Sequence, residues 1–125
     1  MLFRSMQVTV VAEDAPAFRA WWAQQIAARA PPATPDIADG ERVFLSRCST
    51  CHTMRGTSAS GKIGPDLTHV MGRSTIAAGT LPNTRGFLAG WISNPQQIKP
   101  GTQMPAVPLS PSELQALLGY LETLK

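Results

Sequence analysis

The chain has 125 residues but only two cysteines, a scarcity that restricts what they can do. Cys48 and Cys51 lie three positions apart, so a disulfide between them would close too small a loop to stabilise a fold appreciably. A structural zinc site would need two more ligands nearby. The pair is therefore predicted to have a chemical role and not an architectural one.

The sequence also has no long apolar run and no block of like charges. No stretch approaches the roughly 18–20 apolar residues that cross a bilayer, and residues 1–5 do not begin a secretory signal peptide. Eleven Lys and Arg against eight Asp and Glu give a net charge of +3, and the cations are scattered. No nucleic-acid partner is expected from this pattern. The hydrophobic content of 43% is that of an ordinary globular chain.

Residues 1–29 predict a strand and a helix that cannot form a domain alone. Residues 7–13 alternate and are rich in β-branched side chains, which favours a strand. Asp14 can cap a helix with Pro16 in its first turn. One face of that helix is apolar: Phe18, Trp21, Trp22 and Ile26. Since a strand and a helix cannot bury such a face, we interpret residues 1–29 as the end of a larger domain.

Three prolines make residues 30–35 a stiff linker, and a second domain is predicted over residues 36–125. Its first helix should cover residues 37–47, with Asp36 as the cap, and residues 48–82 should be mostly loop. No further strand is evident, so this domain is predicted to be all-α.

Two more helices are expected in the second half of the chain. One begins after Asn83 or Thr84 and ends before Pro95, with Phe87, Leu88, Trp91 and Ile92 directed inward. The last begins at a capping box formed by residues 110–113. Its apolar stripe comprises Leu114, Leu117, Leu118, Leu121 and Leu124.

Cys48-Ser49-Thr50-Cys51-His52 is the pattern by which haem is attached covalently. Two thiols one short turn apart can form thioether bonds to the porphyrin vinyl groups, and His52 is then placed to bind the iron. The alternative is a redox-active or structural CxxC pair followed by an incidental histidine. That alternative usually accompanies a βαβ pattern, which this sequence does not show. Haem c is therefore the predicted cofactor.

The second axial ligand must come from a distant part of the chain. The candidates are Met1, Met6, Met54, Met71, Met104 and His69. Met54 is too near His52 to reach the opposite face of the ring. Met104 follows Pro100 and Gly101 in an irregular loop, and a thioether on a rigid loop suits a ligand, although a lone methionine is often core filler. His/Met ligation would fill both axial positions, which suits electron transfer.

Other residues are candidates for the surroundings of the haem. The carbonyl group of Pro65 could accept a hydrogen bond from the ring of His52. Side chains that could bind the haem propionates are Trp91, Arg73, His69 and Asn83. For each of these four, a packed or surface role is an equal alternative.

Residues 36–125 resemble class I cytochrome c domains. The residues that carry the resemblance are the CxxCH motif, residues 64–67 (GPDL) and residues 101–105 (GTQMP), in the family's order. The resemblance implies the class I cytochrome c fold, in which the first and last helices cross. Gly40 and Phe44 would then pack on Tyr120 and Leu121.

A narrower resemblance is to the cytochrome c that is fused to the C-terminus of cytochrome c oxidase subunit II. Residues 55–57, 64–69, 81–84 and 91–101 carry it. Residues 6–22 are similar to the end of the cupredoxin-like copper domain of that subunit, with Met6 in the place of its final copper ligand. Phe3 departs from the family, which has histidine there, and the other copper ligands have no counterpart. The copper centre is therefore expected only in a full-length parent.

This resemblance implies a function, partners and a location. Haem c would accept single electrons from a soluble or membrane cytochrome c, or from quinol–cytochrome c reductase, and pass them to the binuclear copper centre. The parent would be a cytochrome c oxidase subunit, bound to other oxidase subunits and anchored by transmembrane helices at the outer, periplasmic face of the bacterial membrane. The chain itself would be a soluble fragment that carries electrons without catalytic residues. The alternatives are a free-standing class I cytochrome c and the haem subunit of a periplasmic dehydrogenase.

Overall fold

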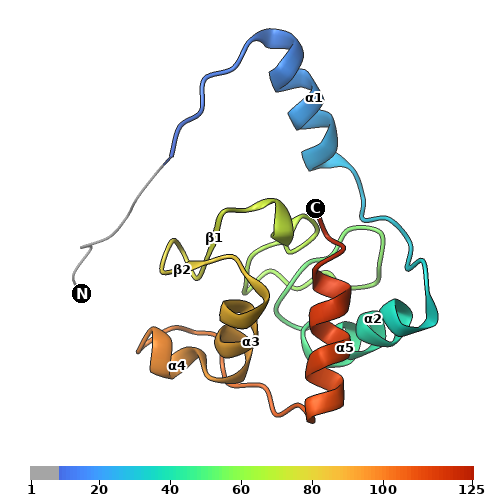
Figure 1. The fold of residues 1–125 in the computed structure, drawn as a ribbon, viewed down its shortest axis with the longest axis vertical. Coiled ribbons are helices and arrows are strands. Elements are labelled where there is room, and N and C mark those ends of the chain that lie inside the picture. The colour runs from blue at the N-terminus through green and yellow to red at the C-terminus, as the bar shows by residue number, and fades with distance from the viewer. Residues whose placement is uncertain (1–8) are drawn as a thin grey trace.

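The computed structural model describes residues 9–125 and contains five helices, a short 3₁₀ turn and one small hairpin (Figure 1). Figure 1 shows α2 to α5 gathered into one body, with α1 standing apart near the C-terminal end. The elements are α1 (Ala15–Ile26), α2 (Pro35–Arg47), η1 (Val70–Gly72), β1 (Thr75–Ile76), β2 (Leu81–Pro82), α3 (Arg85–Ser93), α4 (Pro95–Ile98) and α5 (Pro111–Leu121).

Helices α2 and α5 each begin after a capping residue with a side-chain hydroxyl group. The predicted capping box of α5 is confirmed, because Ser110 Oγ accepts from the Glu113 amide at 3.2 Å and Glu113 Oε2 accepts from the Ser110 amide at 2.7 Å. The prediction that Asp36 caps α2 is wrong. Thr34 is the cap, because Pro35 can occupy the first helical position and leaves Asp36 in the first turn.

The crossing of α2 and α5 is confirmed and forms the centre of the core. Phe44 is fully buried and its ring centroid lies 6.1 Å from that of Tyr120. Gly40 allows the close approach, since a Cβ atom there would lie 2.1 Å from the carbonyl oxygen of Ala116. The two helices therefore meet with their backbones almost in contact.

Two expectations for the second domain need correction. It is mostly helical but not all-α, because β1 and β2 pair antiparallel, with Ile76 opposite Leu81. Strands of two residues are too short to show alternation. Phe87 is 46% exposed and not directed inward. The prediction that α3 ends before Pro95 is confirmed, and Pro95 also opens the unpredicted helix α4, whose first turn is capped by the side chain of Asn94.

The predicted N-terminal helix is confirmed as α1, but the strand before it is not found. The Asp14 carboxylate caps α1 by accepting from the Ala17 amide at 2.9 Å. Residues 9–13, the described part of the predicted strand, are irregular, and no strand within residues 9–125 pairs with them. Met6 and residues 7–8 lie outside the described residues. The apolar face of α1 forms an exposed cluster, with Phe18, Trp21, Trp22 and Ile26 each about half accessible.

The segment that follows α1 is held by contacts with the rest of the domain. Arg29 forms an ion pair with Glu41 of α2, and the two side chains are only 9% and 14% exposed. The His69 ring lies between this segment and the other end of the chain, with Nε2 3.0 Å from the Ala27 carbonyl oxygen and Nδ1 2.7 Å from that of Lys125. Residues 27–29 are therefore held on both sides before the proline-rich stretch begins.

None of the described helices is both long and apolar enough to span a bilayer.

The contact at Gly40 generates a paired test. Gly40→Ala should lower the free energy of unfolding by about 3 kcal/mol, because the added methyl group overlaps the α5 backbone. Gly119→Ala is the matched control, since its Cβ would meet only Ile37 Cδ1 at 3.9 Å. It should stabilise α5 by about 0.5–1 kcal/mol. Urea unfolding followed by circular dichroism measures both, and equal effects of the two substitutions would refute the close crossing.

Candidate haem site

His52 is held rigidly at the edge of a cavity. Its Nδ1 lies 2.8 Å from the Pro65 carbonyl oxygen, so the expected hydrogen bond is present and Nδ1–H donates it. Gly64 packs flat against the ring, because a Cβ there would lie 2.4 Å from His52 Cε1. With Nδ1 protonated, the lone pair of the neutral ring is on Nε2, which is the arrangement of a metal-binding histidine with a carbonyl partner.

The loop that carries Pro65 is fixed by its neighbours. The Asp66 carboxylate accepts from the Thr68 amide at 2.8 Å and pairs with Arg55 Nε at 3.3 Å. Partial burial tends to raise the pKa of Asp66, but the hydrogen bonds from Thr68 and the charges of Arg55 and Arg73 outweigh it and lower that pKa. The charged carboxylate therefore holds the loop in the shape that presents the Pro65 carbonyl to His52.

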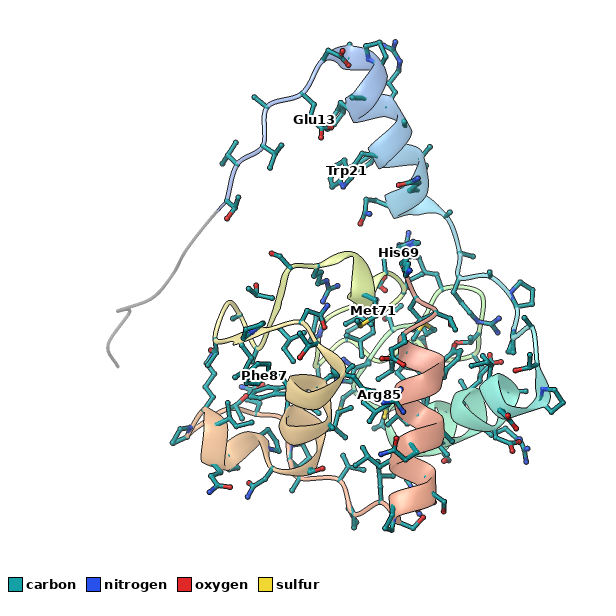
Figure 2. The ribbon with its side chains drawn as sticks, viewed as in Figure 1. Glu13, Trp21, His69, Met71, Arg85 and Phe87 are labelled. Carbon is teal, nitrogen blue, oxygen red and sulfur yellow. The ribbon has the colours of Figure 1, made fainter. Side chains whose placement is uncertain are left out.

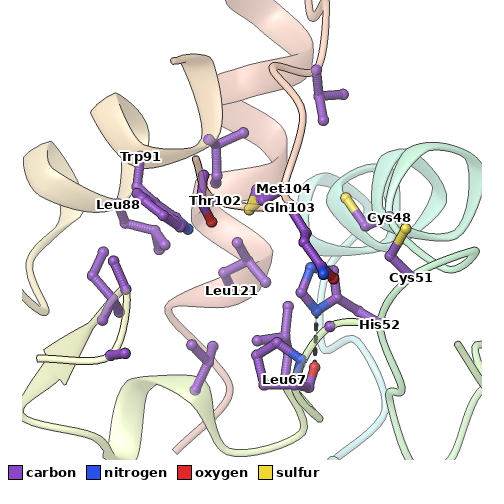
Figure 3. Close-up of a pocket in the computed structure, with 18 of the residues that line it drawn as sticks. Cys48, Cys51, His52, Leu67, Leu88, Trp91, Thr102, Gln103, Met104 and Leu121 are labelled. Atoms are coloured by element: carbon purple, nitrogen blue, oxygen red, sulfur yellow. Dashed lines mark hydrogen bonds between the residues drawn. The ribbon is translucent and has the colours of Figure 1, made fainter. Parts of the chain in front are cut away.

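Cys48 and Cys51 are free thiols at the C-terminal end of α2. The Cys48 amide continues the helix by donating to the Phe44 carbonyl at 2.8 Å, and the Cys51 and His52 amides both donate to the Cys48 carbonyl. This turn projects both sulfurs and His52 toward one cavity (Figure 3). Burial, and then the charge of Cys51, raise the pKa of the Cys48 thiol to about 11. A redox-active CxxC needs a thiol with a lowered pKa, so this environment disfavours that alternative.

The cavity has a volume of about 510 Å³, within the usual range for cofactor sites. Figure 3 shows the two cysteines and His52 on one side and Trp91 and Leu88 of α3 on another. Apolar side chains supply most of its wall, including Phe44, Leu67, Val70, Leu88, Ile92, Leu117 and Leu121. A flat macrocycle with an apolar face and two reactive vinyl groups fits such a wall, with both thiols at its edge.

Met104 is the described methionine that faces this cavity. The loop around it is anchored by Gln96, whose side-chain amide donates to the carbonyls of Thr102 at 2.6 Å and of Met104 at 3.1 Å. Met54 is instead fully buried in the core, and Met71 packs on the core outside the cavity lining. Met1 and Met6 lie outside the described residues. His52 and Met104 are thus brought to one cavity as the two candidate axial ligands.

The four candidate propionate partners separate into two pairs. Trp91 and Arg73 line the cavity. His69 and Asn83 do not line it. The His69 ring is hydrogen-bonded to the carbonyls of Ala27 and Lys125, and the Asn83 side-chain amide donates to the carbonyls of Val70 and Arg73. Lys99 also lines the cavity and was missed by the sequence analysis. Its place five residues before Met104 was the available signal.

Within residues 9–125, no three His, Cys, Asp or Glu side chains cluster as a separate metal site. The suggestion that Met6 is a remnant copper ligand concerns a residue outside that range.

Comparisons with known proteins give a matching family model and several similar proteins. A family model described as cytochrome c matches residues 37–125. The chain is 36% identical over 107 residues to cytochrome c oxidase subunit 2 of Alkalihalophilus pseudofirmus, and the aligned region covers 83% of this chain and 30% of that protein. It is 31% identical over 114 residues to the same subunit of Bacillus sp. (strain PS3), covering 86% and 32%. It is 31% identical over 108 residues to cytochrome c of Sesamum indicum, covering 74% and 92%. The chain thus spans about a third of the length of these oxidase relatives.

The site predicts covalent attachment at two named sulfurs. When the chain is exported in a host with c-type maturation, its haem should survive acid–acetone extraction and denaturing electrophoresis. Cys48→Ala combined with Cys51→Ala should abolish the haem-stained band, whereas Thr50→Ala, between them, should keep it. Haem that extracts freely from the matured wild-type chain would contradict the assignment.

Proposed function

This chain belongs to the cytochrome c family, and on that basis we propose that it transfers single electrons as the cytochrome c part of a cytochrome c oxidase subunit II. The observation that carries the proposal is the His52 side chain, oriented by the Pro65 carbonyl and facing the same cavity as Met104 and both cysteines. Haem c, when bound, supplies an iron that cycles between two oxidation states one electron apart.

The residues of this chain would determine how the haem performs. Cys48 and Cys51 would hold it covalently, and His52 and Met104 would bind the iron from its two sides. The apolar wall excludes water, and a low-dielectric surrounding keeps the change in solvation on electron transfer small. With His52 and Met104 both bound to the iron, no site would remain for oxygen, and the chain would carry electrons without catalytic residues of its own.

The assignment to oxidase subunit II rests on the relatives and on α1. Two of the similar proteins named above are oxidase subunits of which this chain spans about a third. The exposed aromatic cluster on α1 is typical of a helix that packs against further protein. In this proposal residues 1–29 end a copper domain, residues 30–35 link it to the haem domain, and the copper centre of the parent accepts the electron. A cytochrome c or quinol–cytochrome c reductase would be the donor at the periplasmic face.

A free-standing cytochrome c is the second candidate. It is favoured by the match to the cytochrome c of Sesamum indicum, which extends over 92% of that protein. The haem subunit of a periplasmic dehydrogenase would carry the same haem domain and is a variant of this candidate.

The size of the native polypeptide separates these candidates. An antibody against residues 36–125, applied to cells of the source organism, should detect a haem-stained membrane polypeptide roughly three times as long as this chain, in proportion to the coverage of the relatives. Denaturing electrophoresis followed by haem staining and immunoblotting measures it. A single soluble band at 13.4 kDa would exclude the fusion and leave the free-standing cytochrome.

A further inference from the structure

We propose that Lys99 binds one of the two haem carboxylates and thereby raises the reduction potential of the bound haem, an inference that rests on the proposed haem function. Two cationic side chains line the cavity, Arg73 and Lys99, and its described lining contains no Asp or Glu. A wall that is otherwise mostly apolar therefore carries positive charge alone.

Both cations are at the hairpin end of the cavity. Arg73 lies two residues before β1, and Lys99 Nζ donates to the Ala77 carbonyl at 3.3 Å in the loop between β1 and β2. That loop also lines the cavity, and its residues Ala77 and Ala78 have positive φ values of 53° and 56°. The backbone of Lys99 is itself fixed, since its amide caps α4 by donating to the Pro95 carbonyl at 2.8 Å.

The chemistry of the cofactor explains why positive charge belongs at this end. In haem, the vinyl groups and the propionates are carried by different pairs of pyrrole rings. The thioether bonds would hold the first pair beside the cysteines of α2, so the carboxylates extend away from them. Figure 3 shows the cysteines on the opposite side of the cavity from a pale yellow-green strand of the hairpin. A carboxylate that leaves water needs a charged or hydrogen-bonding partner.

Arg73 already lies beside a carboxylate of the protein, and Lys99 does not. The Arg73 guanidinium donates to the Asp66 carbonyl and lies close enough to the Asp66 carboxylate to lower its pKa. Lys99 has three N–H donors, one of which is used by Ala77. In residues 9–125, Lys99 takes part in no ion pair. Its ammonium group therefore has no anionic partner among these residues. It lies on the wall of a site for a cofactor that carries two carboxylates.

The charge of Lys99 determines the direction in which the reduction potential shifts. Oxidised haem carries one more positive charge than reduced haem. A cation held at the edge of the ring therefore disfavours the oxidised form and raises the reduction potential. Removing that charge should favour the oxidised form.

The test is the reduction potential of matured variants, measured by spectroelectrochemical titration. Lys99→Met should shift the equilibrium between reduced and oxidised haem toward the oxidised form about tenfold, which is about 59 mV for one electron. Lys99→Gln should do the same, although its amide can still donate a hydrogen bond, whereas Lys99→Arg should keep the wild-type potential. Lys62→Met is the matched control, since Lys62 is exposed and outside the cavity lining, and it should shift the ratio less than twofold.

Two results would overturn the proposal. If Lys99→Met or Lys99→Gln lowers the thermal midpoint but shifts the potential no more than Lys62→Met does, Lys99 only holds the hairpin loop. If Lys99→Arg shifts the potential as much as Lys99→Gln, charge is not the cause. A wild-type chain that acquires no haem would instead refute the proposed function itself, so the two failures are distinguishable.

Discussion

The hydrogen bond from His52 Nδ1 to the Pro65 carbonyl is the constraint on which the rest of the site depends. It fixes which ring nitrogen is protonated and directs the other toward the cavity. It requires the backbone of Gly64 to lie against the ring, where any other residue would place a Cβ 2.4 Å from it. It also requires a charged Asp66, held by Thr68 and Arg55, to keep the loop in place. The histidine of the five-residue motif is therefore oriented by a second segment, thirteen residues away.

The crossing of α2 and α5 positions that motif. Cys48 is the C-cap of α2, so the direction of α2 sets where both thiols and His52 point. That direction is fixed by the packing of Gly40 and Phe44 against Tyr120 and Leu121. The side chains of Phe44, Tyr120 and Leu121 belong to the core and are each at most 4% exposed. The same two helices give the cavity part of its wall through Phe44, Leu117 and Leu121. Stability and site geometry thus share residues, and substitutions in this core should affect both.

Local chemistry explains which features could be predicted from the sequence. The capping box at Ser110, the Asp14 cap and the CxxCH turn each depend on residues within four positions, and all three local structures are present. The hairpin was missed because two-residue strands have no period. Two long-range contacts of other residues could not be foreseen either. Arg29 pairs with Glu41, and His69 binds carbonyls of Ala27 and Lys125, which withdraws it from the haem side. The position of Lys99 near Met104 gave no sign of its contact with the hairpin loop, which forms only when that loop and the α4 turn are brought together.

The central claim is that one haem iron lies between His52 and Met104. The most direct measurement is the near-infrared absorption of the oxidised, matured chain, where sulfur–iron ligation produces a weak charge-transfer band. The wild-type chain and Met71→Ala, whose sulfur is outside the cavity lining, should both show it, and Met104→Ala should not. A band that persists in Met104→Ala, or that disappears in Met71→Ala, would contradict the account and move the second ligand elsewhere.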